Sequence, residues 1–409
     1  MPRLLLVTTN YWPEPTGVAV YTTDLAELIE NNDFEVSVLT SLPHYPWWKV
    51  PPEFSHIVEG ESHQKSVNIF RVNHLIPPKM NAYLRIRFEL SLWRNLKKVL
   101  KKLAVKDYDV ILACVPTVAA GVVGKKIAVK LGVPFGLIVQ DLSGSGAKQA
   151  GLRGGALISK AALAIEGSVL KAADSMVVVS PAMVDAVTDL GVPPARVLEI
   201  ANYCAREIEI VNRDVARKNF GWESNEFLVI HAGNMGAKQG LENVVEASKA
   251  LSKDANVKIY LVGHGNQEAN LRKLCEGLEN IVVMAAVRDD QFSALLSAAD
   301  LLLINERITQ MDMSLPSKLT SYLYSERPVV AAVPRGGATW KFLDGIAELV
   351  EAGNPSLLAS AIKELSQDPV KRKDLASKGL EFARKNLDAE IGRKKYLDWV
   401  NSLIQAKRG

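Results

Sequence analysis

The sequence contains very little cysteine. Three cysteines, Cys114, Cys204 and Cys275, occur in 409 residues, and no two of them stand at CxxC or CxxxC spacing. An odd number of widely separated thiols excludes a disulfide scaffold and provides no thiolate metal site. We therefore expect a protein of a reducing compartment, the cytoplasm.

Long hydrophobic runs are missing as well. A bilayer-spanning helix needs about 18 or more apolar residues in a row. The longest candidate, residues 110–124, is interrupted by Pro116 and Gly121. The first residues, MPRLLLVTTNYW, have too short an apolar run for a signal peptide and lack a cleavage site. The sequence thus predicts a protein that does not span a membrane.

An excess of charge of one sign is also absent. Lys and Arg number 49 against 45 Asp and Glu, which leaves a net charge of +4. So small a surplus gives no reason to expect nucleic acid as a partner. With 48% hydrophobic and 23% charged residues, the composition is that of a globular protein. Because 409 residues are more than one ordinary core holds, we expect two domains.

What the sequence does contain is an alternation of short β-branched runs with amphipathic stretches. One series of strand candidates extends from Leu4–Thr8 to Val197–Ile200, and a second from Phe227–His231 to Glu348–Val350. Several of these runs are continuously apolar, which is typical of parallel strands covered by helices on both faces. The pattern predicts the α/β class with two doubly wound parallel sheets. The polar stretch Tyr203–Glu226 is interpreted as the linker between them.

Two predicted strands are followed by a glycine-bearing loop and a helix. The first loop ends at Gly17, and the second reads Gly233-Asn234-Met-Gly-Ala-Lys238-Gln-Gly240. Glycines let the backbone approach a phosphate, a helix start offers free N–H groups, and Lys238 adds a cation. These loops are candidates for holding a nucleotide diphosphate, and the alternative is that they are ordinary turns. Neither is a Rossmann or Walker motif, and Gly263-His-Gly265 lacks a third glycine, so a dehydrogenase or kinase is disfavoured.

A third segment, Ser314-Leu-Pro316-Ser317-Lys318, follows the apolar run Leu301–Ile304. Pro316 is expected at the first position of a helix, which proline favours. Ser317 and Lys318 then lie in the first turn, where a cation is unfavourable unless an anion lies beside it. The segment therefore predicts a bound anion at this helix start.

Several segments, taken in order, resemble one family. They are Trp12–Gly17, Gly233–Glu242, Val262–Gly265, Ala298–Asp300 and Pro316–Val330. Together they resemble the retaining GT-B glycosyltransferases of family 4, in the branch of colanic-acid and O-antigen enzymes that includes N-acetyl-fucosaminyl transferases. The resemblance covers nearly all of the chain.

The resemblance implies the GT-B fold, two Rossmann-like domains facing across a cleft. Residues 1–205 would form the acceptor-side domain, residues 206–387 would bind the nucleotide sugar, and a helix in 388–409 would cross back to the first domain. The implied reaction moves a sugar from a nucleotide-diphosphate donor, expected to be a UDP-sugar, to a lipid-linked or saccharide acceptor. A polyprenyl-diphosphate-linked sugar in bacterial surface-polysaccharide synthesis is the implied acceptor. No metal or other cofactor is implied, because cations and helix dipoles would stabilise the leaving diphosphate.

Individual residues receive roles from the same resemblance. Lys238 would contact the diphosphate and act in catalysis, and Val287 would lie near the base. Asn234 stands where many relatives carry arginine. Met313 and Ser321 occupy the positions of a Glu-x₇-Glu pair that many relatives have, and Ser321 would contact the ribose. The implied donor-site residues are Gly17, Gly233, Asn234, Lys238, Gly263, Val287, Pro316, Ser317, Lys318 and Ser321.

Asp141 is the carboxylate that we expect to act in catalysis. It follows the apolar run Phe135–Gln140, so it lies at the carboxyl end of a strand, where relatives often have a His-Asp or Gln-Asp pair. There it would orient the donor sugar or the acceptor hydroxyl, and the alternative is an Asx-turn or helix N-cap. Asp107-Tyr-Asp109 instead precedes a strand and is interpreted as a solvated turn rather than a metal site.

Glu14 and His44 are the candidates for acceptor contacts. His44 lies in the loop Leu42–Trp48 after a predicted strand, and the aromatic residues of that loop could stack on sugar rings. The alternative is that they only pack the loop. His231, which ends a strand beneath the Gly233 loop, is interpreted as a hydrogen-bonded core histidine.

Basic residues gather in one segment, 79–106, where nine Lys and Arg occur against Glu89 alone. Phe88, Leu92 and Leu96 form an apolar stripe at helical spacing, and Trp93 is nearby. A basic amphipathic helix with a tryptophan suits peripheral contact with the anionic inner face of the plasma membrane. The alternative is a solvated helix packed on the domain core.

Two other functions stay open from the sequence. One is a sugar-nucleotide 2-epimerase of the same architecture, which needs several acids and histidines for proton abstraction, whereas only Asp141, His44 and Glu14 are candidates. The other is a catalytically silent GT-B subunit that binds a partner, suggested by the missing glutamate pair. Release of nucleoside diphosphate from a donor by the purified protein separates the silent subunit from an active enzyme.

Overall fold

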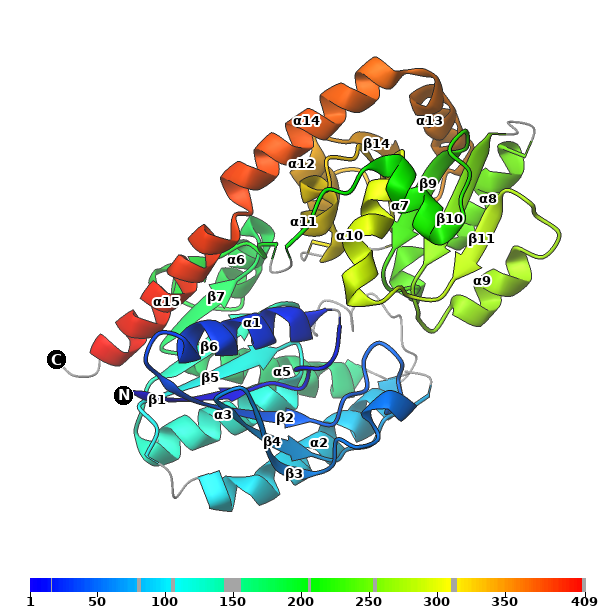
Figure 1. Ribbon diagram of the computed structural model, residues 1–409. Coiled ribbons are helices and arrows are strands. Elements are labelled where there is room, and N and C mark those ends of the chain that lie inside the picture. Colours follow the sequence, from blue (N-terminus) through cyan, green and yellow to red (C-terminus); the bar gives the residue numbers. More distant parts are fainter. Residues whose placement is uncertain are drawn as a thin grey trace. The chain divides into compact units, whose positions relative to one another are not determined.

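The computed structural model consists of two compact units (Figure 1). Unit 1 contains Met1–Asn202 together with Glu390–Gly409, and unit 2 contains Tyr203–Ala389. These boundaries lie within a few residues of the predicted ones. The C-terminal segment belongs to the same unit as the N-terminal half of the chain.

The structure describes most of the chain. The residues outside the description are 16, 79–81, 104–106, 143–155, 205–206, 253–255, 310–314 and 407–409, and the side chains of 82, 100–103 and 156–162 are also outside it. Several residues named from the sequence therefore lie outside the described residues. They are Met313, Ser314, the loop 143–146, and the basic side chains of Lys79, Lys101, Lys102 and Lys106.

Unit 1 is built on an eight-stranded sheet in the order β3-β4-β2-β1-β5-β6-β7-β8. Neighbouring strands are parallel except β3 and β4, which are antiparallel. The strands are β1 (Arg3–Val7), β2 (Glu35–Ser41), β3 (Gly60–Gln64), β4 (Val67–Val72), β5 (Val110–Val115), β6 (Phe135–Val139), β7 (Ser175–Val178) and β8 (Val197–Glu199).

The central strands of unit 1 are buried on both faces, as the continuous apolar runs predicted. Leu4, Leu5 and Leu6 point alternately to the two faces, and none has exposed surface. The edge strand β3 differs, since it reads Gly-Glu-Ser-His-Gln and is mostly exposed. It pairs with β4 through its backbone and carries no apolar signal, so the sequence did not predict it.

The last helix of the chain packs on unit 1 (Figure 1). Trp399 Nε1 donates a hydrogen bond to Ser175 Oγ over 2.9 Å, and Arg393 pairs with Asp24. Gly136 on β6 makes room for this helix, because a Cβ atom there would lie 2.7 Å from Leu403 Cδ1. The helices of unit 1 are α1 (Val18–Glu30), α2 (Ala82–Leu103), α3 (Val118–Leu131), α5 (Ala156–Ala172), α6 (Pro181–Asp189) and α15 (Ala389–Gln405).

Unit 2 has a six-stranded, all-parallel sheet in the order β11-β10-β9-β12-β13-β14. The chain winds outward in one direction from β9 and in the other from β12, so the order of a doubly wound sheet reverses between these two strands. Ligands of such sheets bind at the carboxyl ends of the strands at this reversal. The strands are β9 (Phe227–Ala232), β10 (Val257–Val262), β11 (Ile281–Met284), β12 (Leu301–Asn305), β13 (Val329–Val333) and β14 (Glu348–Glu351).

Helices of unit 2 follow its strands in regular alternation (Figure 1). Asn354 and Asp368 cap two of them, each by accepting a backbone N–H with its side chain. The helices are α7 (Arg213–Phe220), α8 (Glu242–Ala250), α9 (Glu268–Leu274), α10 (Asp289–Ala298), α11 (Lys318–Tyr324), α12 (Ala338–Leu343), α13 (Pro355–Gln367) and α14 (Pro369–Asn386).

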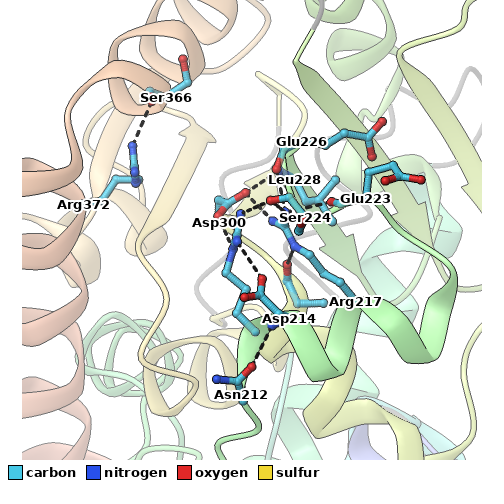
Figure 2. Close-up of polar contacts among 12 residues, drawn as sticks. Asn212, Asp214, Arg217, Glu223, Ser224, Glu226, Leu228, Asp300, Ser366 and Arg372 are labelled. Carbon is cyan, nitrogen blue, oxygen red and sulfur yellow. Dashed lines mark hydrogen bonds and ion pairs between the residues drawn. The ribbon is translucent and has the colours of Figure 1, made fainter.

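The predicted linker Tyr203–Glu226 was wrong, because it contains α7, which packs against α10 as part of unit 2. Arg217 of α7 is only 1% exposed, and its NH2 group donates to Asp300 Oδ2 over 2.5 Å (Figure 2). Its NH1 group also reaches three backbone carbonyl oxygens, those of Glu223, Ser224 and Glu226. The high charge of the segment suggested a linker, but one of those charges anchors the helix.

Candidate functional site

The glycine loops that follow β9 and β10 pack directly on each other. Gly263 has φ +149°, and a Cβ atom at this position would lie 1.8 Å from the carbonyl oxygen of Gly233. Only glycine tolerates both the backbone angle and the close approach. Gly233, with φ +140°, donates its N–H to the Val262 carbonyl over 2.8 Å. The two loops therefore form one rigid backbone surface at the carboxyl edge of the sheet.

Lys318 at the start of α11 extends its ammonium group to this surface. A Cβ atom on Gly233 would lie 3.3 Å from Lys318 Nζ, so the glycine leaves the space that the lysine occupies. The Nζ atom lies 3.0 Å from Nε2 and 3.4 Å from Nδ1 of His231, the penultimate residue of β9. The structure thus brings Gly233, Gly263 and Lys318 together, and their role in holding a diphosphate stays a prediction.

Burial sets the charge of this pair. It lowers the pKa of Lys318 to about 7, although Glu306 acts in the opposite direction. The pKa of His231 lies well below its ordinary value because of burial and the neighbouring Lys318. His231 is therefore a neutral imidazole at physiological pH. Among the described residues Lys318 has no ion pair with a carboxylate, which leaves its charge available to an anionic ligand.

Tyr322 fixes the helix that presents Lys318. Its hydroxyl accepts the N–H of Ala232 over 2.7 Å and donates to the Ala232 carbonyl over 3.3 Å, and the side chain has no exposed surface. The end of β9 and the first turns of α11 are thereby joined. The sequence did not assign this role, although a tyrosine one turn after Lys318 on an apolar helix face is a usable signal.

Asn305 performs a similar task at the end of β12. Its Nδ2 group donates to the carbonyl oxygens of Gln239 and Gly240 over 2.7 and 3.0 Å. The N–H of Arg307 donates to the Lys238 carbonyl over 2.9 Å. The backbone around Lys238 is therefore held in place, while its side chain is exposed.

The remaining predicted donor residues are spread over the carboxyl side of unit 2. Val287 lies between β11 and α10, and Ser321 lies on α11, both partly buried. Asn234 lies next to Gly233 and is also partly buried. Pro316 does not begin the helix as predicted. The helix starts at Lys318, and the Pro316 carbonyl accepts the Leu319 N–H over 3.0 Å, because proline here belongs to the turn that leads into the helix.

In unit 1, Asp141 lies two residues beyond β6, at the carboxyl edge of the sheet. One carboxylate oxygen accepts the N–H of Leu142 over 2.8 Å. The preceding Gln140 exchanges two side-chain hydrogen bonds with Asn202, of 2.9 and 3.1 Å. Asp141 is partly exposed and is held in a defined position.

Glu14 and His44 are brought together, as buried groups. Glu14 is 5% exposed and His44 is 3% exposed, and Glu14 Oε1 lies 3.3 Å from His44 Nδ1. Burial raises the pKa of Glu14, whereas His44 acts to lower it. The ring of His44 also packs edge-on against His74, with 4.6 Å between ring centroids. The acceptor role of both residues stays a prediction.

Gly17 begins α1 with φ +69°, an angle that favours glycine. The solvated turn predicted at Asp107–Asp109 is only partly correct, because Tyr108 is buried and Asp109 Oδ2 accepts the N–H of Arg3 over 2.7 Å at the amino end of β5. In the parts of the chain that the structure describes, no group of three or more His, Cys, Asp or Glu side chains could hold a metal ion.

Comparison with known proteins identifies the family. Residues 16–203 match the family model "Glycosyl transferase 4-like domain", and residues 212–382 match "Glycosyl transferases group 1". The chain is a glycosyltransferase. The two matched regions correspond closely to units 1 and 2.

Individual relatives match this glycosyltransferase over nearly its whole length. It is 28% identical to WcaI of Escherichia coli (strain K12), a glycosyl transferase named for colanic acid biosynthesis, over 95% of this chain and 97% of the relative. Sucrose-phosphate synthase from Thermosynechococcus elongatus has a similar structure, with TM-score 0.77, 16% identity, and coverage of 99% and 100% of the two chains. Anabaena Alr3699/HepE in complex with UDP-glucose has TM-score 0.70, 17% identity, and coverage of 98% and 100%. These likenesses confirm the predicted GT-B fold.

The basic helix α2 of the glycosyltransferase packs on the core of unit 1 through the predicted apolar stripe. Phe88, Leu92 and Leu96 are buried, at 3%, 0% and 0% exposure. Trp93 is flanked by Lys97 and Lys126, whose Nζ atoms lie 5.3 and 5.2 Å from its ring centroid. The opposite face is exposed and consists of Tyr83, Arg87, Leu90, Arg94, Lys97 and Lys98. Of the helices that the structure describes, none combines the length with the hydropathy that a bilayer crossing requires.

Proposed function

We propose that this glycosyltransferase uses a nucleotide-diphosphate sugar, in the first place a UDP-sugar, and transfers the sugar with retention of configuration. The observation that carries the proposal is the Lys318 ammonium group, which lies without a carboxylate partner among the described residues, against the Gly233–Gly263 backbone surface. It lies at the strand-order reversal of unit 2, where doubly wound sheets bind nucleotides. The similarity to a protein solved with UDP-glucose supports the choice of base.

The chemistry follows from the position of the cation. When the bond between sugar and diphosphate breaks, negative charge grows on the leaving phosphate. A fixed ammonium group in a partly desolvated site stabilises that charge without having to reorganise. The side chains of Ser317, Lys238 and Asn234 would share this task. We propose that these groups suffice, so that transfer continues in the presence of EDTA.

A lipid-linked or saccharide acceptor in bacterial surface-polysaccharide synthesis is proposed from the similarity to WcaI, which is named for such a pathway. Asp141, at the carboxyl edge of the sheet in unit 1, would orient the acceptor hydroxyl or the donor sugar.

The proposed donor is tested first by binding. We expect UDP-sugars to raise the melting temperature of the purified protein more than GDP- or TDP-sugars do, because a ligand of the folded state stabilises it by mass action. Release of UDP in the presence of membrane extract as the source of acceptor then reports transfer. Binding without UDP release would favour a silent subunit, and UDP release without transfer to acceptor would favour an epimerase. No stabilisation by any nucleotide would contradict the proposal.

Asp141→Asn tests the carboxylate of unit 1. The amide keeps an oxygen for the Leu142 N–H but loses the negative charge. We expect kcat to fall roughly tenfold or more, because orientation of the reacting groups is lost. The melting-temperature shift caused by UDP should be unchanged. Wild-type turnover in this variant would leave Asp141 with the role of a turn residue.

Peripheral membrane contact is proposed for the exposed face of α2. Arg87, Arg94, Lys97 and Lys98 share that face with Tyr83, which is 67% exposed. Each basic residue near an anionic bilayer contributes about 1 kcal/mol. Reversal of Lys97 and Lys98 to glutamate should lower flotation with phosphatidylglycerol vesicles. The matched variant Lys218→Glu/Lys273→Glu, which changes two exposed lysines of unit 2, should float as the wild type does. Equal flotation of the wild type and both variants would contradict the membrane contact.

A further inference from the structure

Two loops of unit 1 are joined by a buried acid and a buried base. The β1 loop follows β1 and leads to Gly17, and the β2 loop follows β2 and contains His44 and Tyr45. The strands β1 and β2 are parallel neighbours, so both loops leave the carboxyl edge of the sheet side by side. The buried acid is Glu14, and the buried basic residue is Arg71.

Arg71 lies near the end of β4, on the other side of β2, and is 2% exposed. Its Nη1 group donates over 3.0 Å to the carbonyl of Ser41, the last residue of β2, from which the β2 loop begins. Its NH2 group donates to the Trp12 carbonyl over 2.5 Å, in the β1 loop. Burial lowers the pKa of Arg71 to about 10, with Glu14 acting in the opposite direction, so the guanidinium remains charged at neutral pH.

Glu14 joins the same loops through its carboxylate. It belongs to the β1 loop, and its Oε1 atom accepts the backbone N–H groups of His44 and Tyr45 over 2.8 and 2.9 Å. Its Oε2 atom accepts Asn10 Nδ2 over 2.7 Å. All of these donors belong to the protein, so the oxygens of Glu14 are used to hold backbone. A carboxylate that accepts three protein hydrogen bonds in a buried position acts as a brace.

The brace ends at Gly17. A Cβ atom on this glycine would lie 3.2 Å from Cε1 of Tyr45, so the aromatic ring packs against the glycine backbone. The N–H group of Tyr45 is one of the two that Glu14 holds. A continuous series of contacts therefore leads from Arg71 and Glu14 through Tyr45 to Gly17. On the far side the β1 loop is held to α1, where Thr22 Oγ1 donates to the Asn10 carbonyl over 2.8 Å.

We propose that Arg71 and Glu14 are positioning residues that hold the Gly17 backbone at the place it must occupy during sugar transfer. The inference rests on the proposed function and on the donor-site role that the resemblance implies for Gly17. Under this proposal Glu14 holds backbone groups of the protein and does not contact the acceptor. Buried groups of this kind are suited to the task, because a buried group with several hydrogen bonds has one low-energy position, and a displacement of about 1 Å can cost 10²-fold in rate.

The first variant is Arg71→Met, which keeps much of the side-chain volume and removes the bonds to Trp12 and Ser41. We expect kcat to fall between about tenfold and a hundredfold. Most of the melting-temperature shift caused by UDP should persist, since the residues expected to hold UDP, apart from Gly17, belong to unit 2. Arg71→Lys, which can reach one carbonyl but not both in the same geometry, should restore part of kcat.

Glu14 distinguishes a brace from a chemical role. Glu14→Gln keeps an oxygen for the N–H groups of His44 and Tyr45 and should retain most of kcat. Glu14→Ala should lose as much kcat as Arg71→Met. If Glu14 instead acted on the acceptor as a base or charged ligand, Gln and Ala would be equally inactive, and the proposal would be overturned.

The matched control is Arg393→Met, which removes a pairing of another arginine in unit 1, the one with Asp24 on α1. It should lower the melting temperature without changing kcat for each UDP-binding molecule. Should Arg71→Met fail to fold, Glu14→Ala and Tyr45→Ala carry the test. A wild-type enzyme that binds no UDP would contradict the proposed function, whereas an active wild type with unchanged kcat in the brace variants would contradict only this inference.

Discussion

Replacement of Lys318 by methionine is expected to lower kcat/KM about 10²–10³-fold, the usual cost of removing one preorganised group that stabilises developing negative charge. Methionine occupies the space beside Gly233 with a chain of similar length, but it cannot neutralise the negative charge of a phosphate. The UDP-induced rise in melting temperature should therefore disappear as well. Initial rates of UDP release and the thermal shift measure the two effects.

The same substitution should make the free protein more stable. Lys318 lies beside the neutral imidazole of His231 in a desolvated site, which is unfavourable for an ammonium group. We expect the melting temperature of Lys318→Met at about pH 6 to exceed that of the wild type by roughly 2–4 °C. Loss of function together with a gain in stability is characteristic of a functional group that the fold tolerates at a cost.

The pH dependence of this gain has a defined sign. The pKa of Lys318 is about 7 in the folded protein and has its ordinary, higher value in the unfolded chain. Between these values the unfolded chain binds more protons, so the stability of the wild type rises with pH in that window. The advantage of the methionine variant should therefore shrink from neutral pH to about pH 10.

Donor affinity should change in the opposite sense. The free enzyme loses the Lys318 proton as pH rises through about 7, and binding of the diphosphate must then take a proton up. The affinity for UDP-glucose, whose diphosphate does not titrate in this range, should fall as pH increases. Lys249→Met, which removes an exposed lysine of α8, is the control and should change neither affinity nor stability. An unaltered donor affinity in Lys318→Met would refute the assignment.

The architecture could be predicted because burial on both faces leaves a strong imprint on a parallel strand. Runs such as Leu4–Val7 and Leu301–Ile304 have no polar position, and the structure buries them entirely. The strand β3 could not be predicted, because its partner contacts are backbone hydrogen bonds that any sequence can make. Helix α7 was missed for a related reason, since Arg217 resembles a surface residue until its buried partners are known.

For the proposed donor site, the sequence indicated the loops but not the contacts between them. The glycine-bearing loop after a strand indicated Gly233, and the resemblance added Gly263, but only the structure shows that the carbonyl oxygen of Gly233 lies where a Cβ atom on Gly263 would be. Lys318 was identified through its unfavourable place in a first turn, whereas His231 was interpreted as a core residue and proves to be its neighbour. Non-local proximity of this kind depends on sheet order, which spacing along the chain does not encode.

The motif Ala298-Ala-Asp300 shows how a family signature can be structural. Asp300 precedes β12, at the amino edge of the sheet, and Lys318 follows the carboxyl edge. The Oδ2 atom of Asp300 accepts the N–H of Leu228 over 2.8 Å and binds Arg217. The Oδ1 atom of Asp300 accepts a hydrogen bond from Arg213 Nε over 2.9 Å. Figure 2 shows Arg217 and Asp300 pointing toward each other between α7 and the strands. The motif therefore fastens α7 to the sheet.

Removal of Arg217 from this network should destabilise unit 2 strongly. Arg217→Met leaves the partly buried Asp300 without the buried one of its two arginine partners and removes the hydrogen bonds to the carbonyls of Ala298, Glu223 and Glu226. Breaking a buried ion pair by removing one partner costs about 3–5 kcal/mol. The loss of stability is measured by urea titration of fluorotryptophan-labelled protein, with ¹⁹F NMR as the probe. The ring centroids of Trp222 and Tyr260 lie 4.3 Å apart, so the Trp222 signal reports on the end of α7.

Two further variants separate charge from packing in that result. Arg213→Gln removes the outer, partly exposed partner of Asp300 and should cost less than about 1 kcal/mol. Asp300→Asn in the Arg217→Met background neutralises the stranded carboxylate and should recover part of the stability, a positive coupling that a double-mutant cycle measures. Because the network lies at the amino edge, kcat per folded molecule should stay at the wild-type value in every variant. A loss of kcat without a loss of stability would place Arg217 and Asp300 in the catalytic cycle and contradict a purely structural motif.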